Sequence, residues 1–258
     1  MASSMRVALR LAYLGHAFAG WQKQRARRTV QGELEGALER LYARPVTVVG
    51  AGRTDAGVHA AGQVAHYDAP HPIPPAGVLA ALNTLLPDEI RVLGAKCVPQ
   101  TFHAQRDALA KVYCYRLAWG APLPPWEAQR RVLLPSRPDL AAMRQGMAVL
   151  AGTHDFAAFA RRGHSGTGQR GTVRTLSAVD LRGHGRRLDL VFAGDGFLRG
   201  MVRRLVGALL EIGRGKQDAA WLAALLGDPG VDPPAPTAVA DGLTLERVVY
   251  RRRSASSA

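Results

Sequence analysis

Hydrophobic and polar positions in the first hundred residues follow two different periods. Four segments alternate or are rich in β-branched residues, which predicts strands: 5–14, 46–49, 63–67 and 90–98. Two segments repeat apolar residues at helical spacing, which predicts helices: 30–42 and 78–85. Thr29 stands before the first of them and is a good N-cap type. The predicted order is strand, helix, strand, strand, helix, strand.

The second half of the chain loosely repeats this pattern. Strands are predicted over four segments: 112–119, 172–181, 187–192 and 243–250. Helices are predicted over three segments: 139–150, 198–212 and 218–226. The expected fold is α+β, with two fused ferredoxin-like halves whose mainly antiparallel sheets carry helices on one face. The halves are expected at 5–108 and 109–250, with disordered tails at 1–4 and 251–258.

Apolar stretches and cysteines exclude several classes of protein. Arg, Asp, Gly or Pro interrupts every apolar stretch well before the roughly 18 residues that a membrane span needs. The first thirty residues lack the apolar core of a signal peptide, so a cytoplasmic location is expected. Cys97 and Cys114 are too few for a disulfide framework or a zinc site, and no His pattern suggests a metal.

The charge of the chain narrows the choice of partner. The sequence contains 34 Lys and Arg against 20 Asp and Glu, a formal net charge of +14. The cations are spread over predicted strands and loops rather than along one interfacial helix, which favours nucleic acid over a membrane surface. A G-x-G-x-x-G match at 166–171 lacks the strand before it and the helix after it that dinucleotide binding requires. The basic segment 161–174 is interpreted either as a loop that lies near RNA phosphates or as a surface loop without function.

The segment AGRTDAGVHA at 51–60 carries the strongest candidate for chemistry. Gly52 and Gly57 flank Arg53 and Asp55, so the backbone can turn tightly and present a carboxylate from a loop between two strands. A cation two residues away favours the ionised form of a carboxylate. From spacing alone, an Asx-turn next to glycine is the favoured interpretation of Asp55, because this role is very common.

Several separated blocks together resemble one enzyme family. GRTDAGVHA is preceded by FAGWQKQ and TVQGELEGAL, and is followed in order by FHA, KVYCY, GTHDFAAF, VRTL, GDGFLRGMVRRLVGALLEIGRGK and DGLTLERVVY. This arrangement covers nearly the whole chain and resembles the tRNA pseudouridine synthase A family. The resemblance implies an isomerase that converts uridine to pseudouridine at positions 38, 39 and 40 in the anticodon stem-loop of tRNA. It implies a homodimer, no cofactor and an active-site cleft between the halves.

The resemblance also assigns roles to four residues. Asp55 matches the catalytic aspartate, and sequence does not choose between nucleophilic addition and removal of a ribose proton. Tyr113 matches the tyrosine that stacks on the target base, although alternation alone does not separate it from Tyr115. Arg203 matches the arginine that reaches the catalytic carboxylate. Arg53 is expected to assist base flipping or hold phosphate, with pairing to a nearby acid as the alternative.

Some residues have an alternative interpretation, and others differ from the residue that the family has at that position. Arg199 and Arg203 lie one turn apart on a predicted helix, where solvated or phosphate-binding arginines are the alternative reading. Asp195 is expected to be a cap or turn residue. Gln105 stands where the family usually has Arg, and Val239 where it often has Pro. Two other functions fit less well: an RNA-binding protein without catalysis, and a glycosidase, which normally needs a second carboxylate.

Overall fold

The computed structural model describes residues 5–161, 171–232 and 234–251 and has a mixed α+β fold. The chain divides into two compact units: the first takes in the residues up to Ala110 and those from Leu245 on, and the second is Lys111–Thr244. The α+β class predicted from sequence is confirmed. The boundaries 5–108 and 109–250 stay a prediction. Of the tails predicted at 1–4 and 251–258, all but residue 251 lie outside the described residues.

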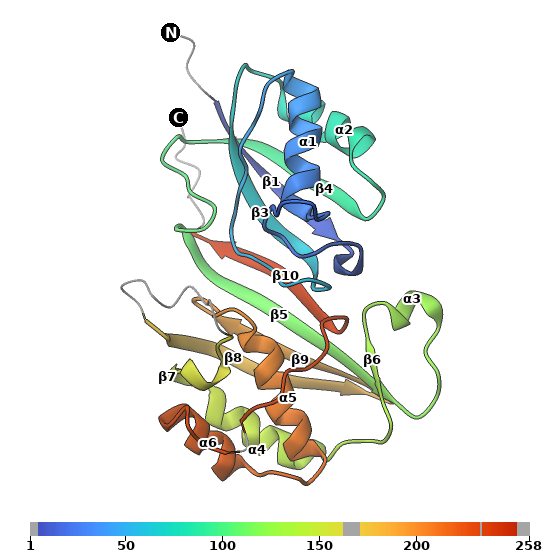
Figure 1. Cartoon of the computed structure of the whole chain (residues 1–258), viewed down its shortest axis with the longest axis vertical. Coiled ribbons are helices and arrows are strands. Elements are labelled where there is room, and N and C mark those ends of the chain that lie inside the picture. The colour runs from blue at the N-terminus through green and yellow to red at the C-terminus, as the bar shows by residue number, and fades with distance from the viewer. Residues whose placement is uncertain (1–4, 162–170, 233, 252–258) are drawn as a thin grey trace, which may run out of the picture. The chain divides into compact units, whose positions relative to one another are not determined.

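The first unit has a small sheet with helices on one face (Figure 1). Its elements in chain order are β1 (Met5–Tyr13), η1 (Gly15–Ala17), α1 (Val30–Tyr42), β2 (Val49–Gly50), β3 (His59–Ala69), α2 (Pro75–Leu85) and β4 (Ile90–Val98), and it also takes in most of β10 (Leu243–Tyr250). Strand β1 pairs antiparallel with β3 and β4, and β2 and β10 are further neighbours of β3. The order β4-β1-β3-β2 with two helices is that of a split βαβ unit.

Local signals in the sequence explain the elements of this unit. In β1, Val7, Leu9 and Leu11 are 0 to 1% exposed, as their alternation predicts. Helix α1 begins after Thr29, whose side chain accepts a hydrogen bond from Gly32 N at 3.2 Å. Leu34 and Leu38 of α1 are fully buried. The apolar face of the helix therefore packs into the core as the spacing requires.

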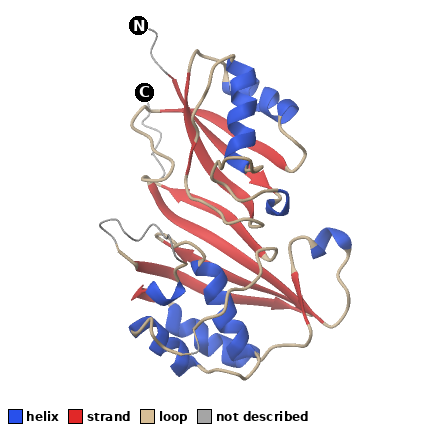
Figure 2. Cartoon of the chain, in the orientation of Figure 1, coloured by secondary structure: helices blue, strands red, loops and turns tan. Residues whose placement is uncertain are grey.

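The second unit is built in the same way, with more insertions (Figure 2). Its elements are β5 (Ala108–Trp119), α3 (Pro125–Ala128), β6 (Val132–Leu134), α4 (Leu140–Leu150), β7 (Gly152–Asp155), η2 (Ala157–Phe159), β8 (Val173–His184), β9 (Arg187–Gly194), α5 (Met201–Gly213) and α6 (Ala219–Gly227). The strand order is β5-β9-β8-β7 with antiparallel pairing, and β6 joins β5 in parallel. Helices α4, α5 and α6 pack together against one face.

The structure differs from the sequence predictions at several positions, including the strand at 46–49, the start of α5 and Asp195. The strand predicted at 46–49 is reduced to Val49–Gly50, although Val46 and Val48 are buried. Helix α5 begins at Met201 rather than Leu198, because Gly200 takes a positive φ of 74° before it. Asp195 is not the N-cap of α5, which is Gly200, and its Oδ1 accepts from Thr175 N at 3.1 Å.

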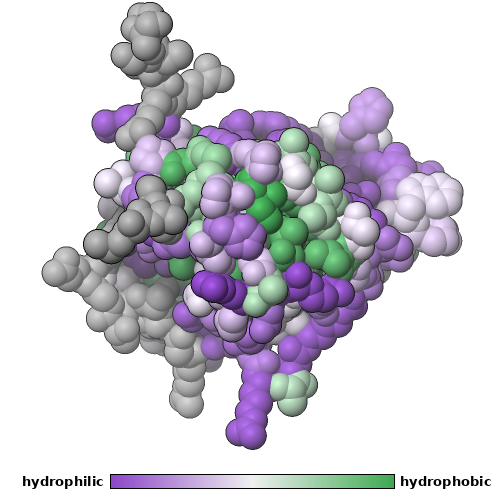
Figure 3. All heavy atoms as spheres, turned by 90° about the horizontal axis from the view of Figure 1, so that it is seen from above, coloured by the Kyte–Doolittle hydropathy of each residue, from purple (hydrophilic) through white to green (hydrophobic). Residues whose placement is uncertain are grey.

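One face of the molecule is largely polar. Figure 3 shows one face, on which hydrophilic residues predominate around a limited hydrophobic patch. Among the described residues, no helix has both the length and the apolarity to cross a membrane.

The FHA segment at 102–104 is fixed to the first unit by buried polar contacts. His66 is 4% exposed, and its Nδ1 accepts from Ala104 N at 3.1 Å. Tyr250 donates its hydroxyl to Ala104 O at 2.6 Å, and Arg6 donates to Phe102 O at 2.8 Å. Burial, followed by the nearby Arg6 cation, lowers the pKa of His66 to about 4. His66 therefore stays neutral and keeps its acceptor at neutral pH.

This depressed pKa makes folding stability pH-dependent. Between pH 6.5 and about 4 the unfolded chain binds a proton at His66 that the folded chain rejects. The free energy of unfolding should fall by about 2 kcal/mol as pH drops through that window. In His66→Asn the amide oxygen can still accept from Ala104 N but cannot titrate, so the decline should be shallower. Urea titrations at a series of pH values measure the free energy of unfolding of both chains. An equal decline of that free energy with falling pH in both chains would contradict this role for His66.

Candidate active-site residues

Asp55 lies on a loop of the first unit between β2 and β3. The loop turns at Asp55, where Val58 N donates to Asp55 O at 3.1 Å and Gly57 takes a φ of 82°. Asp55 is partly exposed, whereas Thr54 before it is 6% exposed. Arg53, two residues from Asp55 on the same loop, is exposed. The loop thus leaves both predicted charged residues accessible while anchoring the residue between them.

Two glycines allow another segment of the first unit to pack directly on this loop. A Cβ atom on Gly15 would lie 2.1 Å from Val58 O, and one on Gly20 would lie 2.7 Å from Thr54 O. Gly20 also has a φ of 98°, a conformation that residues with a side chain rarely adopt. The backbone contact is fixed by a hydrogen bond from Trp21 N to Thr54 O at 3.1 Å. We call residues 15–21 the glycine clamp.

A buried polar network supports the same loop from beneath. Tyr13 and Thr54 share a hydrogen bond of 2.9 Å between their hydroxyls. Gln63, fully buried in β3, donates to Gly52 O at 2.8 Å. Burial raises the pKa of Tyr13 to about 12, against the opposing effect of the Thr54 hydrogen bond. The phenol therefore stays neutral and the network holds across the physiological pH range.

Sequence reasoning did not identify the clamp or this network. Gln63 gave the one local signal, because a polar residue lies among the apolar residues of a strand and is expected to need a buried partner. The partners themselves are distant in sequence, and no spacing rule connects them.

In the second unit, Tyr113 and Tyr115 have different surroundings. Both lie on β5 and are buried, at 6% and 0% exposed. The Tyr113 ring meets Phe197 edge-on, with centroids 5.0 Å apart at 78°. Tyr115 donates to Val239 O at 3.0 Å, and its pKa is raised by burial, partly offset by Arg203. Tyr115 is thus a core residue bonded to the 236–242 loop, and Tyr113 faces the segment that leads into α5.

Arg203 connects α5 to that same loop. Its Nε donates to Ala238 O at 2.7 Å, and its own carbonyl accepts from Ala238 N at 3.0 Å. One turn on, a Cβ atom on Gly207 would lie 2.0 Å from Pro236 O, so the loop lies directly on the helix. Arg203 is partly buried, whereas Arg199 is exposed before the helix starts. The interpretation as a fully solvated arginine therefore does not apply to Arg203.

The remaining candidates lie partly beyond what the structure describes. Arg162, Arg170 and most of the G-x-G-x-x-G match fall within 162–170, outside the described residues. Arg174 is 7% exposed and donates to Val173 O at 2.6 Å, so it helps to fix its own strand end. In residues 5–161, 171–232 and 234–251 we find no group of three or more His, Cys, Asp or Glu side chains placed to hold a metal ion. Cys97 is exposed and Cys114 is buried.

The chain is similar to known proteins over most of its length. A family model described as tRNA pseudouridine synthase matches residues 11–106 and 147–251. A relative from Desulfotalea psychrophila, tRNA pseudouridine synthase A 1, is 40% identical over 95% of this chain and 99% of its own. Relatives named tRNA pseudouridine synthase A from Frankia casuarinae and Shouchella clausii are 43% and 42% identical over 95% of this chain, and 89% and 93% of theirs. A solved Cbf5-Nop10-Gar1 complex gives a TM-score of 0.32 at 11% identity, over 79% of this chain and 54% of that one.

These matches define an RNA-modifying isomerase. The chain belongs to the tRNA pseudouridine synthase family, as its sequence motifs predict.

The glycine clamp yields a test that uses a matched pair of substitutions. In Gly20→Ala, the new Cβ would lie 2.7 Å from Thr54 O at a strained φ, so the Asp55 loop must shift. We expect a loss of about 1 to 3 kcal/mol in unfolding free energy and a slower formation of pseudouridine. Gly36→Ala, on α1 with nothing within 4 Å of its new Cβ, is the control and should be neutral or stabilising. Urea unfolding and single-turnover rates measure both; a Gly20→Ala chain with unchanged rate and stability would contradict the clamp.

Proposed function

We propose that this chain isomerises uridine to pseudouridine in the anticodon stem-loop of tRNA, at positions 38, 39 and 40. The reaction breaks the bond between N1 and C1′, turns the uracil and joins C5 to C1′. Substrate and product are isomers, so no redox partner or group donor enters the balance. We therefore infer that the chain works without a cofactor or metal.

The observation that carries this proposal is the placement of Asp55. Its loop is packed by the glycine clamp on one side and by Tyr13 and Gln63 on the other, while the residue itself stays partly exposed. A carboxylate that is both fixed and accessible can act as a nucleophile or as a base without the entropy cost of first ordering its loop. We infer that Asp55 is the catalytic residue.

Aromatic and basic residues supply the rest of the proposed site. A uridine taken out of its helix loses stacking worth about 1 to 3 kcal/mol per base, which an aromatic plane can replace. We infer this role for Tyr113, whose ring is oriented by Phe197. Arg53 and Arg203 are inferred to bind the substrate, since guanidinium groups pair with phosphate and carboxylate alike.

The net charge and the family both support tRNA as the partner. A net charge of +14 attracts the phosphate backbone of RNA, and arginine accounts for 30 of the 34 cations. We infer that the chain acts in the cytoplasm as a homodimer. These last two statements rest on the family resemblance.

Replacing the carboxylate of Asp55 by an amide tests whether Asp55 is the catalytic residue. Asp55→Asn keeps the size of the side chain but cannot serve as nucleophile or base, so pseudouridine formation should fall at least about 100-fold. Affinity for tRNA should stay within a few-fold, because Asp55 contributes no cation to phosphate binding. Tritium release from uridine labelled at C5 measures the rate, and filter binding measures the affinity.

A second aspartate supplies the control for this experiment. Asp88 has a side chain that is 99% exposed and lies on a different loop of the first unit, so Asp88→Asn should keep the wild-type rate. If Asp55→Asn forms pseudouridine at the rate of Asp88→Asn, the assignment of Asp55 is wrong. If both bind tRNA and the wild type forms no pseudouridine, the chain is an RNA-binding protein without this activity.

A further inference from the structure

A short hairpin at residues 22–28 joins the glycine clamp to α1 and carries four cations. An isolated β-bridge between Gln24 and Arg27 closes it, with Arg25 and Ala26 at the turn. Ala26 takes a φ of 58°, which a residue with a side chain keeps only where its surroundings hold it there. We call residues 22–28 the basic hairpin.

Contacts with α1 and with the glycine clamp hold the base of the basic hairpin in place. Gln31 of α1 is 8% exposed, and its Oε1 accepts from Gln22 Nε2 at 2.8 Å and from Lys23 N at 2.9 Å. At the other end of the hairpin, the Arg28 guanidinium lies over the Phe18 ring, 4.8 Å from its centroid. The turn is thus presented from a preorganised base, which lowers the entropy lost when a ligand binds.

Acidic neighbours neutralise two of the four cations of the basic hairpin. Lys23 pairs with Glu35 at 3.0 Å, and Arg28 pairs with two glutamates of the first unit at 2.9 and 3.2 Å. Arg25 and Arg27 are exposed, and in the part of the chain that the structure describes no ion pair involves either of them. The turn therefore carries two positive charges that no carboxylate offsets.

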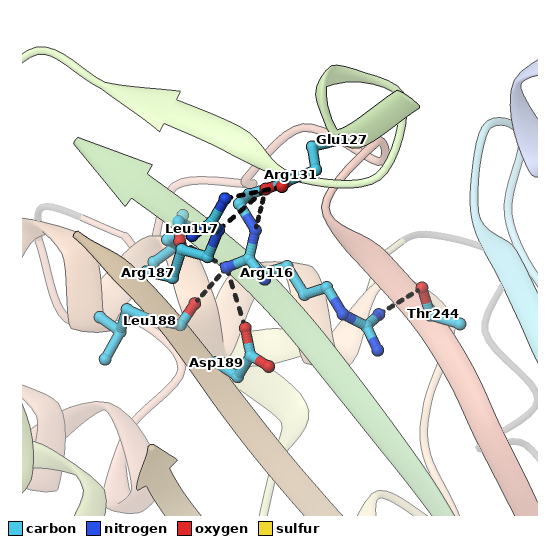
Figure 4. A network of polar contacts seen from close by, with 8 residues as sticks. All are labelled: Arg116, Leu117, Glu127, Arg131, Arg187, Leu188, Asp189 and Thr244. Atoms are coloured by element: carbon cyan, nitrogen blue, oxygen red, sulfur yellow. Dashed lines mark hydrogen bonds and ion pairs between the residues drawn. The ribbon is translucent and has the colours of Figure 1, made fainter. Parts of the chain in front are cut away.

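Arginines of the second unit show the opposite situation. Glu127 accepts two hydrogen bonds from Arg187, at 2.9 and 2.7 Å, so this guanidinium is engaged within the fold (Figure 4). The guanidinium groups of Arg25 and Arg27 keep their donors for a ligand. Guanidinium donors match the oxygens of a phosphate, and two adjacent cations without an acid between them favour a polyanion.

The basic hairpin begins directly after the contact between the glycine clamp and the Asp55 loop. Trp21 N donates to Thr54 O at 3.1 Å, and a Cβ atom on Gly20 would lie 3.2 Å from the carbonyl carbon of Asp55. Four residues of extended chain span at most about 14 Å, so the Cα atom of Arg25 lies within that distance of the Cα atom of Trp21. A phosphate bound at the turn therefore belongs to the same stretch of RNA as a nucleotide at Asp55.

We propose that Arg25 and Arg27 bind a phosphate of the tRNA backbone and position the substrate strand beside Asp55. The proposal rests on the proposed function and deepens it, because it names residues that hold the RNA for that reaction. A contact with the backbone carries no information on base sequence. The contact is the same before and during the reaction, so it contributes to affinity rather than to the rate of the bound complex.

Filter binding of tRNA to the full chain at several salt concentrations tests the contact. The chain with both Arg25→Ala and Arg27→Ala should bind tRNA at least about 10-fold more weakly. Its slope of log K against log salt should be shallower by about 1, because one phosphate fewer is neutralised. A double variant with the wild-type affinity and slope would overturn the proposal.

Arg44 supplies the control for the loss of positive charge. It is also exposed, and it follows the C-terminal end of α1, whereas the basic hairpin precedes the N-terminal end. Arg44→Ala should leave the affinity and the salt slope unchanged. If Arg44→Ala weakens binding as much as Arg25→Ala does, net charge alone explains the effect and the phosphate site is wrong.

Substitutions of Ala26 separate the position of the charges from their number. Ala26→Pro keeps all four cations but fixes φ near −65°, so the turn is lost and affinity should fall toward that of the double alanine variant. Ala26→Gly adopts a positive φ readily and should bind tRNA like the wild type. An Ala26→Pro chain that folds, as judged by circular dichroism, and binds tRNA with the wild-type affinity would contradict a site built by this turn.

Single-turnover formation of pseudouridine over a range of tRNA concentrations distinguishes positioning of the RNA from support of the Asp55 loop. The double alanine variant should react slowly at low tRNA concentration and approach the wild-type rate at saturation. A lower rate at saturation with an unchanged half-saturating concentration would show that the hairpin supports the loop, and would overturn the phosphate contact.

The same samples separate this proposal from the proposed function. A wild-type chain that forms pseudouridine, together with a double alanine variant that binds tRNA equally well, overturns the phosphate site alone. A wild-type chain whose tRNA affinity depends on Arg25 and Arg27 but which forms no pseudouridine supports the phosphate site and overturns the proposed function.

Discussion

The contact between two backbone segments in the first unit determines what the Asp55 loop can do. The glycine clamp approaches so closely that a Cβ atom on Gly15 or Gly20 would overlap with residues 54–58. Backbone packing of this kind leaves little room for the loop to shift, and the hydrogen bond from Trp21 N to Thr54 O fixes its position. The clamp is also joined to the first turn of α1, because the carbonyl oxygens of Gly20 and Trp21 accept hydrogen bonds from Val30 N and Gln31 N. The loop is thus tied to a capped helix and to the sheet at the same time.

The second unit uses a similar device around the 236–242 loop. Arg203 holds Ala238 from α5, and Tyr115 holds Val239 from β5. Gly207 and Gly242 permit close approach on either side, since a Cβ atom on Gly242 would lie 2.7 Å from the Tyr115 ring. A helix, a strand and a loop that are far apart in sequence are thereby fixed to one another. The proposed binding residues Tyr113 and Arg203 lie on the two rigid elements of this set.

The sequence predicted those parts of the fold that local signals determine. Helix α1 was predicted over 30–42 and is found there, because its apolar spacing and the Thr29 cap are both local. Of the strand predicted at 46–49, only Val49 is in a strand. Val46 and Val48 are buried, but a short run of buried valines has the same sequence pattern whether or not a neighbouring strand pairs with it. For the site, the motif around Asp55 was identifiable, and the role assigned to it stays a prediction. The clamp, Gln63 and Phe197 were missed because their contacts are made between segments distant in the chain.

The central claim is that the carboxylate of Asp55 acts from one fixed position. Asp55→Glu tests it most directly, because this change keeps the acid and moves it by one methylene group. If the loop cannot shift to compensate, single-turnover formation of pseudouridine should fall at least about 100-fold, the scale on which a displacement of about 1 Å acts. A chain with Asp55→Glu that reacts within a few-fold of the wild-type rate would contradict the account.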